Sequence, residues 1–339
     1  MRLTRESIRR GVAAAVFLSV IALLAIVLLS SRRTLVEAWR GFSPVAFIIG
    51  GIAIALVWSA KAGRMYVIAR AMGRRIPFVR FFQIYMTTCF VSHITPFSAG
   101  GVPMQVYLIH REGIPLGEST ALTAVDIGLN LLVLAVVVPI AFSLKREGLS
   151  YKVPAWLGWV VAVLAVLVVA GFLWRRFFGR SSRPKAGWLE NWRREYRLFR
   201  LGLTNLTRSG KSGLAVSILL TFAYWLFYLL VAPIILLGLG VKVPWGYVLG
   251  AQLVFNFLQV LLPTPGGSGG SELLLLGIFA PILEQQGERG IFILLWKFYT
   301  FYATLMMGGF FFWRLLSARG TNLGRGLDLE ADSEEQLEE

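Results

Sequence analysis

The sequence predicts an all-α polytopic membrane protein, and three observations carry that prediction. The chain has 339 residues, of which 56% are hydrophobic and only 15% are charged, a composition too apolar for a soluble domain of this length. Several segments run almost without a charge for roughly the 20 residues that a membrane-spanning helix needs. Two clusters rich in glycine and proline, residues 95–101 and 263–270, interrupt further apolar segments about half the chain apart.

We predict six full membrane spans and two broken helical hairpins. The spans are residues 11–30, 43–62, 117–142, 155–174, 213–237 and 290–314, and the hairpins are 80–110 and 246–284. At about 1.5 Å per residue, each hairpin arm is too short for the roughly 30 Å hydrocarbon core, so each hairpin should be re-entrant and leave by the side it entered. The breaks free backbone N–H and C=O groups, which only a buried or water-lined site satisfies.

The distribution of lysine and arginine sets the orientation. With the N-terminus in the cytoplasm, this topology collects most basic side chains on the cytoplasmic side, including the basic segment 175–211, as the positive-inside rule requires. The arginines before residues 11–30, and the lack of a convincing cleavage site, indicate an uncleaved first span. We therefore expect a multi-pass protein of the inner (cytoplasmic) membrane with both termini in the cytoplasm.

The pattern predicts two membrane repeats, residues 1–150 and 151–317, followed by a disordered acidic tail, residues 318–339. Each repeat would hold three crossings and one hairpin. Because three is odd, the second repeat would be inverted relative to the first, so the two hairpins would enter from opposite sides and their tips could meet near the midplane. That is the architecture of an inverted-repeat transporter.

Residues 187–206 combine apolar and basic side chains at helical spacing, for example Trp192 and Phe199 with Arg193 and Arg200. This pattern predicts a short interfacial amphipathic helix on the inner leaflet. The alternative is a helix that packs on the cytoplasmic loops of the protein itself.

Few ionisable groups lie within the apolar segments, so each is a candidate for function. Asp126 lies deep in the third span and needs a partner, because a buried unpaired carboxylate costs several kcal/mol; Lys297 is our candidate. Lys61 and Arg64 end the second span and either serve a site or extend to the headgroups. Glu272 follows the second cluster, where the helix dipole alone also favours an acidic residue.

Two helix N-termini, one after each glycine-rich turn, would aim free N–H groups into one cavity, an arrangement that binds anionic groups. We therefore predict a site for a lipid phosphate or another head group between the hairpins. The predicted binding residues are Lys61, Arg64, His93, Thr95, Ser98, Gly100, Gly101, Gln105, Asn256, Gln259, Thr264, Gly266, Gly267, Ser268, Glu272 and Lys297. Asp126 and Glu272 are candidates for proton coupling. For His93 the alternative is a structural role, and for Ser268 a helix cap.

Motifs for catalysis, metals and nucleic acids are missing from the sequence. Cys89 is the only cysteine and there are two histidines, too few for a multi-cysteine or Cys/His metal site. The sequence has no HExxH or GxSxG motif, and the string at 210–212 lacks the rest of a Walker motif. The net charge of +16 comes with no nucleic-acid-binding module. We expect no catalytic residue, no cofactor and no nucleic-acid partner.

The strings ITPFSAGGVPMQ (94–105) and PTPGGSGGSE (263–272) resemble the two signature regions of the lysylphosphatidylglycerol synthase transmembrane region family. The resemblance spans about residues 10–317. It implies a polytopic inner-membrane domain that, in fused members, moves aminoacylated phosphatidylglycerol between leaflets. The turn glycines and the glutamate of the family motifs match Gly100, Gly101, Gly266, Gly267 and Glu272 here, whereas residue 102 is valine where close relatives often carry glutamine.

The chain ends in its acidic tail without a soluble aminoacyl-transferase domain, so we expect a stand-alone lipid flippase and not a synthase. Its partners would be membrane lipids, anionic or phosphate-containing, and either a second copy of the chain or a separate lipid-synthesising enzyme. Two alternatives stay open: an integral-membrane enzyme that modifies lipids, and a non-transporting partner of such an enzyme.

Overall fold

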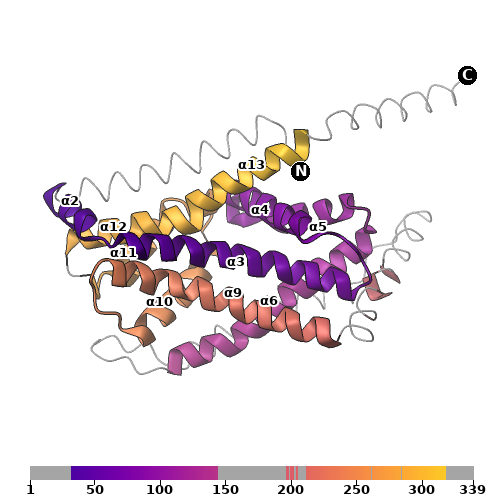
Figure 1. Cartoon of the computed structure of the whole chain (residues 1–339), viewed down its shortest axis with the longest axis horizontal. Coiled ribbons are helices and arrows are strands. Elements are labelled where there is room, and N and C mark those ends of the chain that lie inside the picture. Colours follow the sequence, from indigo (N-terminus) through magenta and orange to yellow (C-terminus); the bar gives the residue numbers. More distant parts are fainter. Residues whose placement is uncertain are drawn as a thin grey trace, which may run out of the picture.

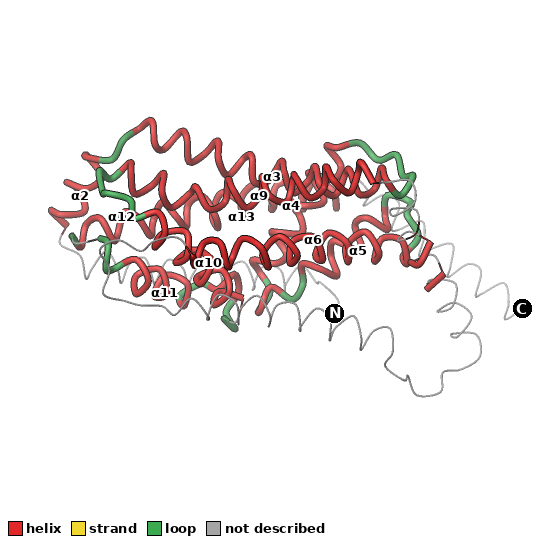
Figure 2. Tube along the Cα trace, turned by 90° about the horizontal axis from the view of Figure 1, so that it is seen from below, coloured by secondary structure: helices red, strands yellow, loops and turns green. Residues whose placement is uncertain are grey.

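The computed structural model describes residues 32–143, 196–197, 199–201, 204, 211–260, 262–283 and 285–317. In these residues the regular structure is entirely helical (Figures 1 and 2). The longer helices are α2 (Arg32–Gly41), α3 (Pro44–Ala71), α4 (Phe78–Ile94), α5 (Gly101–Arg111), α6 (Leu116–Ser143), α9 (Lys211–Gly238), α10 (Trp245–Val260), α11 (Gly270–Phe279), α12 (Gln286–Lys297) and α13 (Ala303–Ser317). Three short elements join some of them: η1 (Pro96–Ser98), η2 (Pro265–Gly267) and the π-helix η3 (Phe298–Tyr302).

Four helices are long and apolar enough to cross a membrane: Pro44–Ala71, Leu116–Val138, Ser212–Gly238 and Gln286–Leu315. They correspond to four of the six predicted spans, and they make this a multi-pass, all-helical membrane protein. The predicted spans 11–30 and 155–174 and the predicted tail 318–339 lie outside the described residues.

The described parts of the predicted amphipathic segment are helical. Phe199 is buried and packs among side chains of the first half of the chain, including Met65 and Leu122. At this position the segment packs on helices α3 and α6; its placement on the inner leaflet or on the cytoplasmic loops stays a prediction. Most of residues 187–206 lie outside the described residues.

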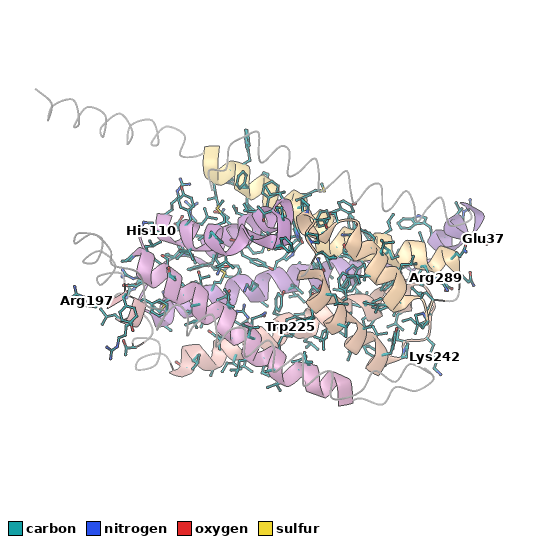
Figure 3. All side chains as sticks on the ribbon, turned by 180° about the vertical axis from the view of Figure 1, so that it is seen from behind. Glu37, His110, Arg197, Trp225, Lys242 and Arg289 are labelled. Carbon is teal, nitrogen blue, oxygen red and sulfur yellow. The ribbon has the colours of Figure 1, made fainter. Side chains whose placement is uncertain are left out.

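The helices form an elongated bundle in which α3 and α9 lie side by side along the long axis (Figure 1). Ser43 caps α3 by accepting a hydrogen bond from the Ala46 amide (3.4 Å), and Pro44 occupies the first helical position, where its missing N–H loses nothing. The side chains labelled at the two ends of the bundle are mostly charged, with Trp225 between them (Figure 3). This is the polarity expected of a bundle with an apolar belt around its middle.

The second predicted span ends too early. We placed its end at residue 62, next to Lys61 and Arg64, whereas α3 continues to Ala71. Arg64 is completely buried and ion-paired within this helix. Its charge therefore does not mark the membrane boundary, and this is why the predicted end was too early.

Helix α13 crosses α4 at very short distance through Gly308. A Cβ on Gly308 would lie 2.9 Å from the Phe90 Cβ and would overlap the Met86 carbonyl oxygen. Small residues of this kind permit close helix packing within membranes.

We expect Gly308→Ala to lower the free energy of unfolding by about 1–3 kcal/mol, because the added methyl group forces the two backbones apart. The measurement is thermal unfolding of the purified protein in detergent. Gly250→Ala in α10, where a Cβ would meet nothing within 4 Å, is the control and should be neutral or slightly stabilising. Equal effects of the two changes would contradict the close packing of α4 and α13.

Candidate functional site

The two glycine-rich clusters form two hairpin turns that begin in the same way. The first cluster joins α4 to α5 through η1, and the second joins α10 to α11 through η2. In each turn a Thr-Pro pair opens the short helix, and the next α-helix begins six residues after the threonine. The shared geometry supports the sequence prediction that the halves carry equivalent hairpins.

The backbone of the two turns agrees over the first four residues and then differs, since Ala99 is helical (ψ −24°) and Ser268 is extended (ψ 141°). Phe97 (φ 54°) and Ser98 (φ 53°) are left-handed, and the equivalent residues Gly266 (φ 60°) and Gly267 (φ 68°) are left-handed too. For residues other than glycine this conformation costs about 1–2 kcal/mol. Strain of that kind is often found at functional sites.

The hairpin turns contact each other, η1 against η2. The residues of η1 are exposed, Phe97 to 56%, whereas Gly266 and Gly267 of η2 are buried. Gly266 makes the contact possible, because a Cβ there would lie 3.0 Å from the His93 carbonyl oxygen and would overlap the Phe301 ring. The two turns therefore meet, as predicted; that they meet near the midplane of the membrane stays a prediction.

Thr95 satisfies part of the backbone that the first break leaves open. Its hydroxyl donates to the Val91 carbonyl oxygen (2.8 Å) and accepts from the Gly100 amide (3.1 Å). In the second turn the hydroxyls of Thr264 and Ser268 are buried without a hydrogen-bond partner among the described residues. None of these three side chains lines the pocket described next, so they belong to the scaffold of the turns.

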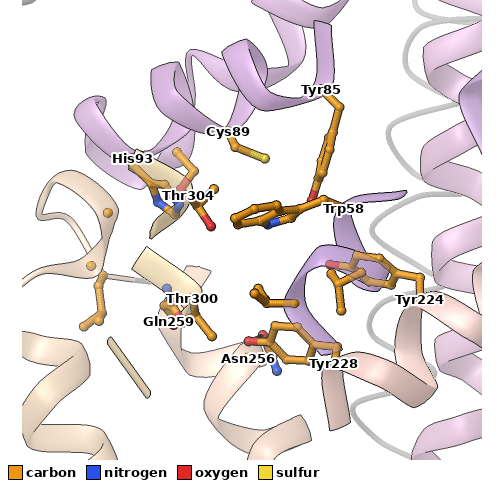
Figure 4. Close-up of a pocket in the computed structure, with 16 residues that line it drawn as sticks. Trp58, Tyr85, Cys89, His93, Tyr224, Tyr228, Asn256, Gln259, Thr300 and Thr304 are labelled. Carbon is orange, nitrogen blue, oxygen red and sulfur yellow. Dashed lines mark hydrogen bonds between the residues drawn. The ribbon is translucent and has the colours of Figure 1, made fainter. Parts of the chain in front are cut away.

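A pocket of about 220 Å³ lies between the hairpins and the central helices (Figure 4). It is lined by Ile54, Val57, Trp58, Tyr85, Cys89, His93, Ser98, Tyr224, Tyr228, Asn256, Gln259, Leu262, Gly266, Gly267, Thr300 and Thr304. Six of the predicted binding residues are in this set: His93, Ser98, Asn256, Gln259, Gly266 and Gly267. Both hairpins thus contribute to one pocket.

The first group of buried charges lies outside the pocket lining and holds α3 to α6. Asp126 accepts from Lys61 Nζ (2.5 Å) and Arg64 Nε (2.7 Å), and Gln105 Nε2 is 3.4 Å from the same carboxylate. Arg64 also donates to Thr221 on α9 (3.0 Å), and its second terminal nitrogen has no hydrogen-bond partner among the described residues. Two cations surround one carboxylate, so the group has an excess positive charge.

Our prediction that Asp126 pairs with Lys297 is wrong. Lys61 and Arg64 are the partners because both lie on the face of α3 that packs against α6. For Arg64, which is fully buried, the alternative of extending to the headgroups is wrong too.

The second group of buried charges joins the second hairpin to α12. Lys297 Nζ lies 3.1 Å from Glu272 Oε1 and donates to Ser271 Oγ (2.8 Å), which in turn donates to Glu272 Oε2 (2.9 Å). Lys297 also sits 4.6 Å from the centre of the Phe301 ring, and the His93 ring packs edge-on against Phe301. The pair therefore borders the pocket without lining it.

The remaining predicted residues, Gly100 and Gly101, permit close packing within the first hairpin. A Cβ on Gly100 would lie 2.8 Å from the Thr95 side chain, and one on Gly101 would overlap the Ser92 hydroxyl. Ser268 does not cap α11, whose N-cap is Gly269 without a side-chain hydrogen bond.

The sequence did not indicate the aromatic and threonine side chains that line the pocket. They are Trp58 from α3, Tyr85 from α4, Tyr224 and Tyr228 from α9, and the pair Thr300 and Thr304. The only local signal was the spacing of the two threonines, one helical turn apart and just after Lys297. Thr300 lies within the π-helix η3 and Thr304 follows it, and π-helices are frequent at functional sites.

At one end of the bundle Arg74, which follows α3, makes two hydrogen bonds of 2.7 Å to Glu118 at the start of α6. These hydrogen bonds raise the pKa of Arg74 above its ordinary value. The pair fastens the loop after α3 far from the pocket lining. Among the described residues no group of three or more His, Cys, Asp or Glu side chains could hold a metal ion.

The comparisons with known proteins agree with this architecture. A family model described as "Lysylphosphatidylglycerol synthase TM region" matches residues 12–308. A "UPF0104 membrane protein" of Archaeoglobus fulgidus is 24% identical over 271 residues, 74% of this chain and 80% of its own. A protein of the same description from Methanothermobacter thermautotrophicus is 24% identical over 150 residues, 44% of this chain and 42% of its own. Since the family model covers most of the chain, the protein is a member of the lysylphosphatidylglycerol synthase TM region family.

Proposed function

We propose that this protein moves a lipid head group between the two leaflets of the inner membrane, through the pocket between its two hairpin turns. The acyl chains would stay in the surrounding lipid. One observation carries the proposal: two hairpins from opposite halves of the chain meet at a pocket that both of them line.

One arm of each hairpin is short, which supports a re-entrant placement; the other arms, α4 and α10, have 17 and 16 residues. Helices α5 and α11 have 11 and 10 residues, which at about 1.5 Å per residue is roughly half of the 30 Å hydrocarbon core. Turns at the ends of such arms would lie near the middle of the bilayer, where broken backbone occurs only in protein or around water. Inverted-repeat transporters hold their substrates at this depth.

The two groups of buried charges support a transport role as well. Charges within membrane spans are expensive and characteristic of transport pathways and proton relays. Glu272 and Asp126, each held by cations, are the carboxylates that we assign to proton coupling. Lys61, Arg64, Gln105 and Lys297, predicted as binding residues, act in this proposal by holding those carboxylates.

Leaflet-specific transport in proteoliposomes tests the proposal. The purified protein would be reconstituted with lipids that carry a fluorophore on one acyl chain, and a membrane-impermeant quencher would report the fraction in the outer leaflet. The panel would hold anionic, zwitterionic and aminoacylated lipids. At least one lipid should equilibrate faster than in protein-free vesicles. Equilibration of every lipid at the protein-free rate would contradict the proposal, and turnover of a lipid by the protein in detergent would favour the enzyme alternative.

We expect Glu272→Gln to slow transport about tenfold or more, a loss of roughly 1.4 kcal/mol at the barrier, because Lys297 loses its only charged partner among the described residues. Glu118→Gln, which breaks the pair with Arg74 outside the pocket, is the matched control and should transport normally. Thermal unfolding and size-exclusion chromatography would confirm that both variants fold. Normal transport by folded Glu272→Gln would count against any role of this pair.

A further inference from the structure

The wall of the pocket carries no Asp, Glu, Lys or Arg side chain, although the chain has buried charges close by. Those charges face one another: Asp126 is held by Lys61 and Arg64, and Glu272 by Lys297. A charged group in the pocket would therefore lose its hydration without gaining a counter-ion in the wall, which is costly. The wall suits a neutral group.

The polar groups of the wall both donate and accept hydrogen bonds. They are amides, hydroxyls, a thiol, an imidazole and the indole N–H: Asn256, Gln259, Ser98, Thr300, Thr304, Tyr85, Tyr224, Tyr228, Cys89, His93 and Trp58. The side chains of Trp58, Gln259 and Thr304 have no hydrogen-bond partner among the described residues. An ammonium group only donates and a phosphate only accepts, whereas hydroxyl groups do both. A mixed set of this kind therefore fits a hydroxyl-rich ligand.

Aromatic rings cover one side of the pocket. Figure 4 shows Trp58 reaching into its centre, with Tyr85 on one side and Tyr224 and Tyr228 on another. The negative face of an aromatic ring attracts the slightly positive C–H groups on a face of a sugar ring. It would also attract a cation. However, Lys61 lies one helical turn after Trp58 on α3, and the two cations around Asp126 exceed its charge, so the local field disfavours a cationic group.

The size of the pocket limits what it holds. Its volume of about 220 Å³ is below the roughly 300–1,000 Å³ of pockets that enclose a drug-sized ligand. One sugar ring is an appropriate size for it, and an oligosaccharide or a whole lipid is not. We propose that the pocket between the hairpins binds a single neutral sugar residue at the head of a membrane lipid. This assignment rests on the proposed function and names its substrate class.

The first test adds a glycolipid to the transport panel. Acyl-labelled monoglucosyl diacylglycerol would be compared with phosphatidylglycerol, phosphatidylethanolamine and phosphatidylcholine carrying the same label. We expect the glucosyl lipid to equilibrate about tenfold faster than the choline lipid. Equal rates for all four lipids, or a preference for an amine-headed lipid or for phosphatidylglycerol, would overturn the sugar assignment and leave lipid transport standing.

The second test asks where the sugar sits, and it does not depend on transport. The protein would be placed in phosphatidylcholine nanodiscs with a glucosyl lipid that carries a photoreactive group on its sugar, and the cross-linked peptides would be identified by mass spectrometry. We expect label on peptides that contain Trp58 or Gln259, and its loss when unlabelled glucosyl lipid competes. Cross-linking to other peptides, or cross-linking that unlabelled glucosyl lipid does not reduce, would overturn the assignment.

Paired variants make both tests specific. Trp58→Ala removes an aromatic face and should reduce cross-linking and glucosyl-lipid transport about tenfold, whereas Trp58→Phe keeps a face and should retain most of both. Trp245→Ala, at the exposed start of α10, is the control for loss of a tryptophan and should behave as the wild type. If all lipids stay at the protein-free rate while cross-linking is normal, the transport proposal falls and the sugar site stands. If Trp58→Ala is folded and cross-links as the wild type does, the sugar site falls.

Discussion

Replacing Asp126 with alanine should lower the free energy of unfolding by about 3–5 kcal/mol, because it leaves buried cations without their counter-charge. Lys61 and Arg64 both contact this carboxylate, at 2.5 and 2.7 Å, and the side chains of Arg64 and Asp126 are fully buried. Removal of one partner from a buried ion pair is far more damaging than removal of the whole group. Thermal or denaturant unfolding in detergent is the measurement.

Two further variants test whether the loss of stability comes from the uncompensated charges of Lys61 and Arg64. The triple change Lys61→Met, Arg64→Met and Asp126→Leu removes all three charges and should recover most of the lost stability, as uncharged side chains of similar size often replace buried pairs at little cost. Glu118→Ala breaks a more exposed pair and should cost at most about 1 kcal/mol. If Asp126→Ala and Glu118→Ala lowered the free energy of unfolding equally, the buried Lys61 and Arg64 would not need the Asp126 carboxylate as a counter-charge.

Gly266→Ala should abolish most transport, and its effect should greatly exceed that of Gly269→Ala. Both glycines have positive φ, 60° and 84°. Alanine costs about 1–2 kcal/mol at Gly266, which is in the left-handed helical region (ψ 16°), and is strained at least as much at Gly269, which is in the γ-turn region (ψ −62°), so a larger effect at Gly266 cannot come from backbone strain. Only at Gly266 does the new methyl group also meet the other hairpin, 3.0 Å from the His93 carbonyl oxygen, while at Gly269 it meets nothing within 4 Å. The difference between the two variants therefore measures the contact between the turns.

The leaflet assay in proteoliposomes is the measurement for this pair, with thermal unfolding to confirm that both variants fold. A transport rate for Gly266→Ala within about twofold of that for Gly269→Ala, well under 1 kcal/mol at the barrier, would show that the contact of the turns is not needed for movement of the lipid.

The sequence predicted the features of this protein that local chemistry determines. The Thr-Pro and Gly-Gly pairs of each cluster interrupt an α-helix, so both hairpin turns could be located in the chain; the re-entrant placement that their short arms predicted stays a prediction. Four spans were located from apolar length alone, although the end of α3 was not, because a charged residue such as Arg64 marks a membrane boundary only when it is exposed.

The sequence did not predict which helix faces pack against each other. The partner of Asp126 depended on the rotation of α3 relative to α6, and nothing in the local pattern of residues 44–71 fixes that angle. The aromatic wall of the pocket has the same origin, since Trp58 and Tyr228 come together through the packing of α3 along α9. Because the apolar segments hold few charges, the sequence indicates those charges as the candidate site. In the structure most of them pair with one another and join helices, while neutral side chains line the pocket between the hairpins.

Because η1 contacts η2 directly, neither hairpin can move without disturbing the other. A displacement that carries the second turn away from the first would uncover the His93 carbonyl oxygen, against which Gly266 packs. Within a bilayer that oxygen would need a hydrogen-bond donor from water or from a bound molecule. Under the proposed transport, a bound ligand would therefore make separation of the hairpins easier than it is in the empty protein.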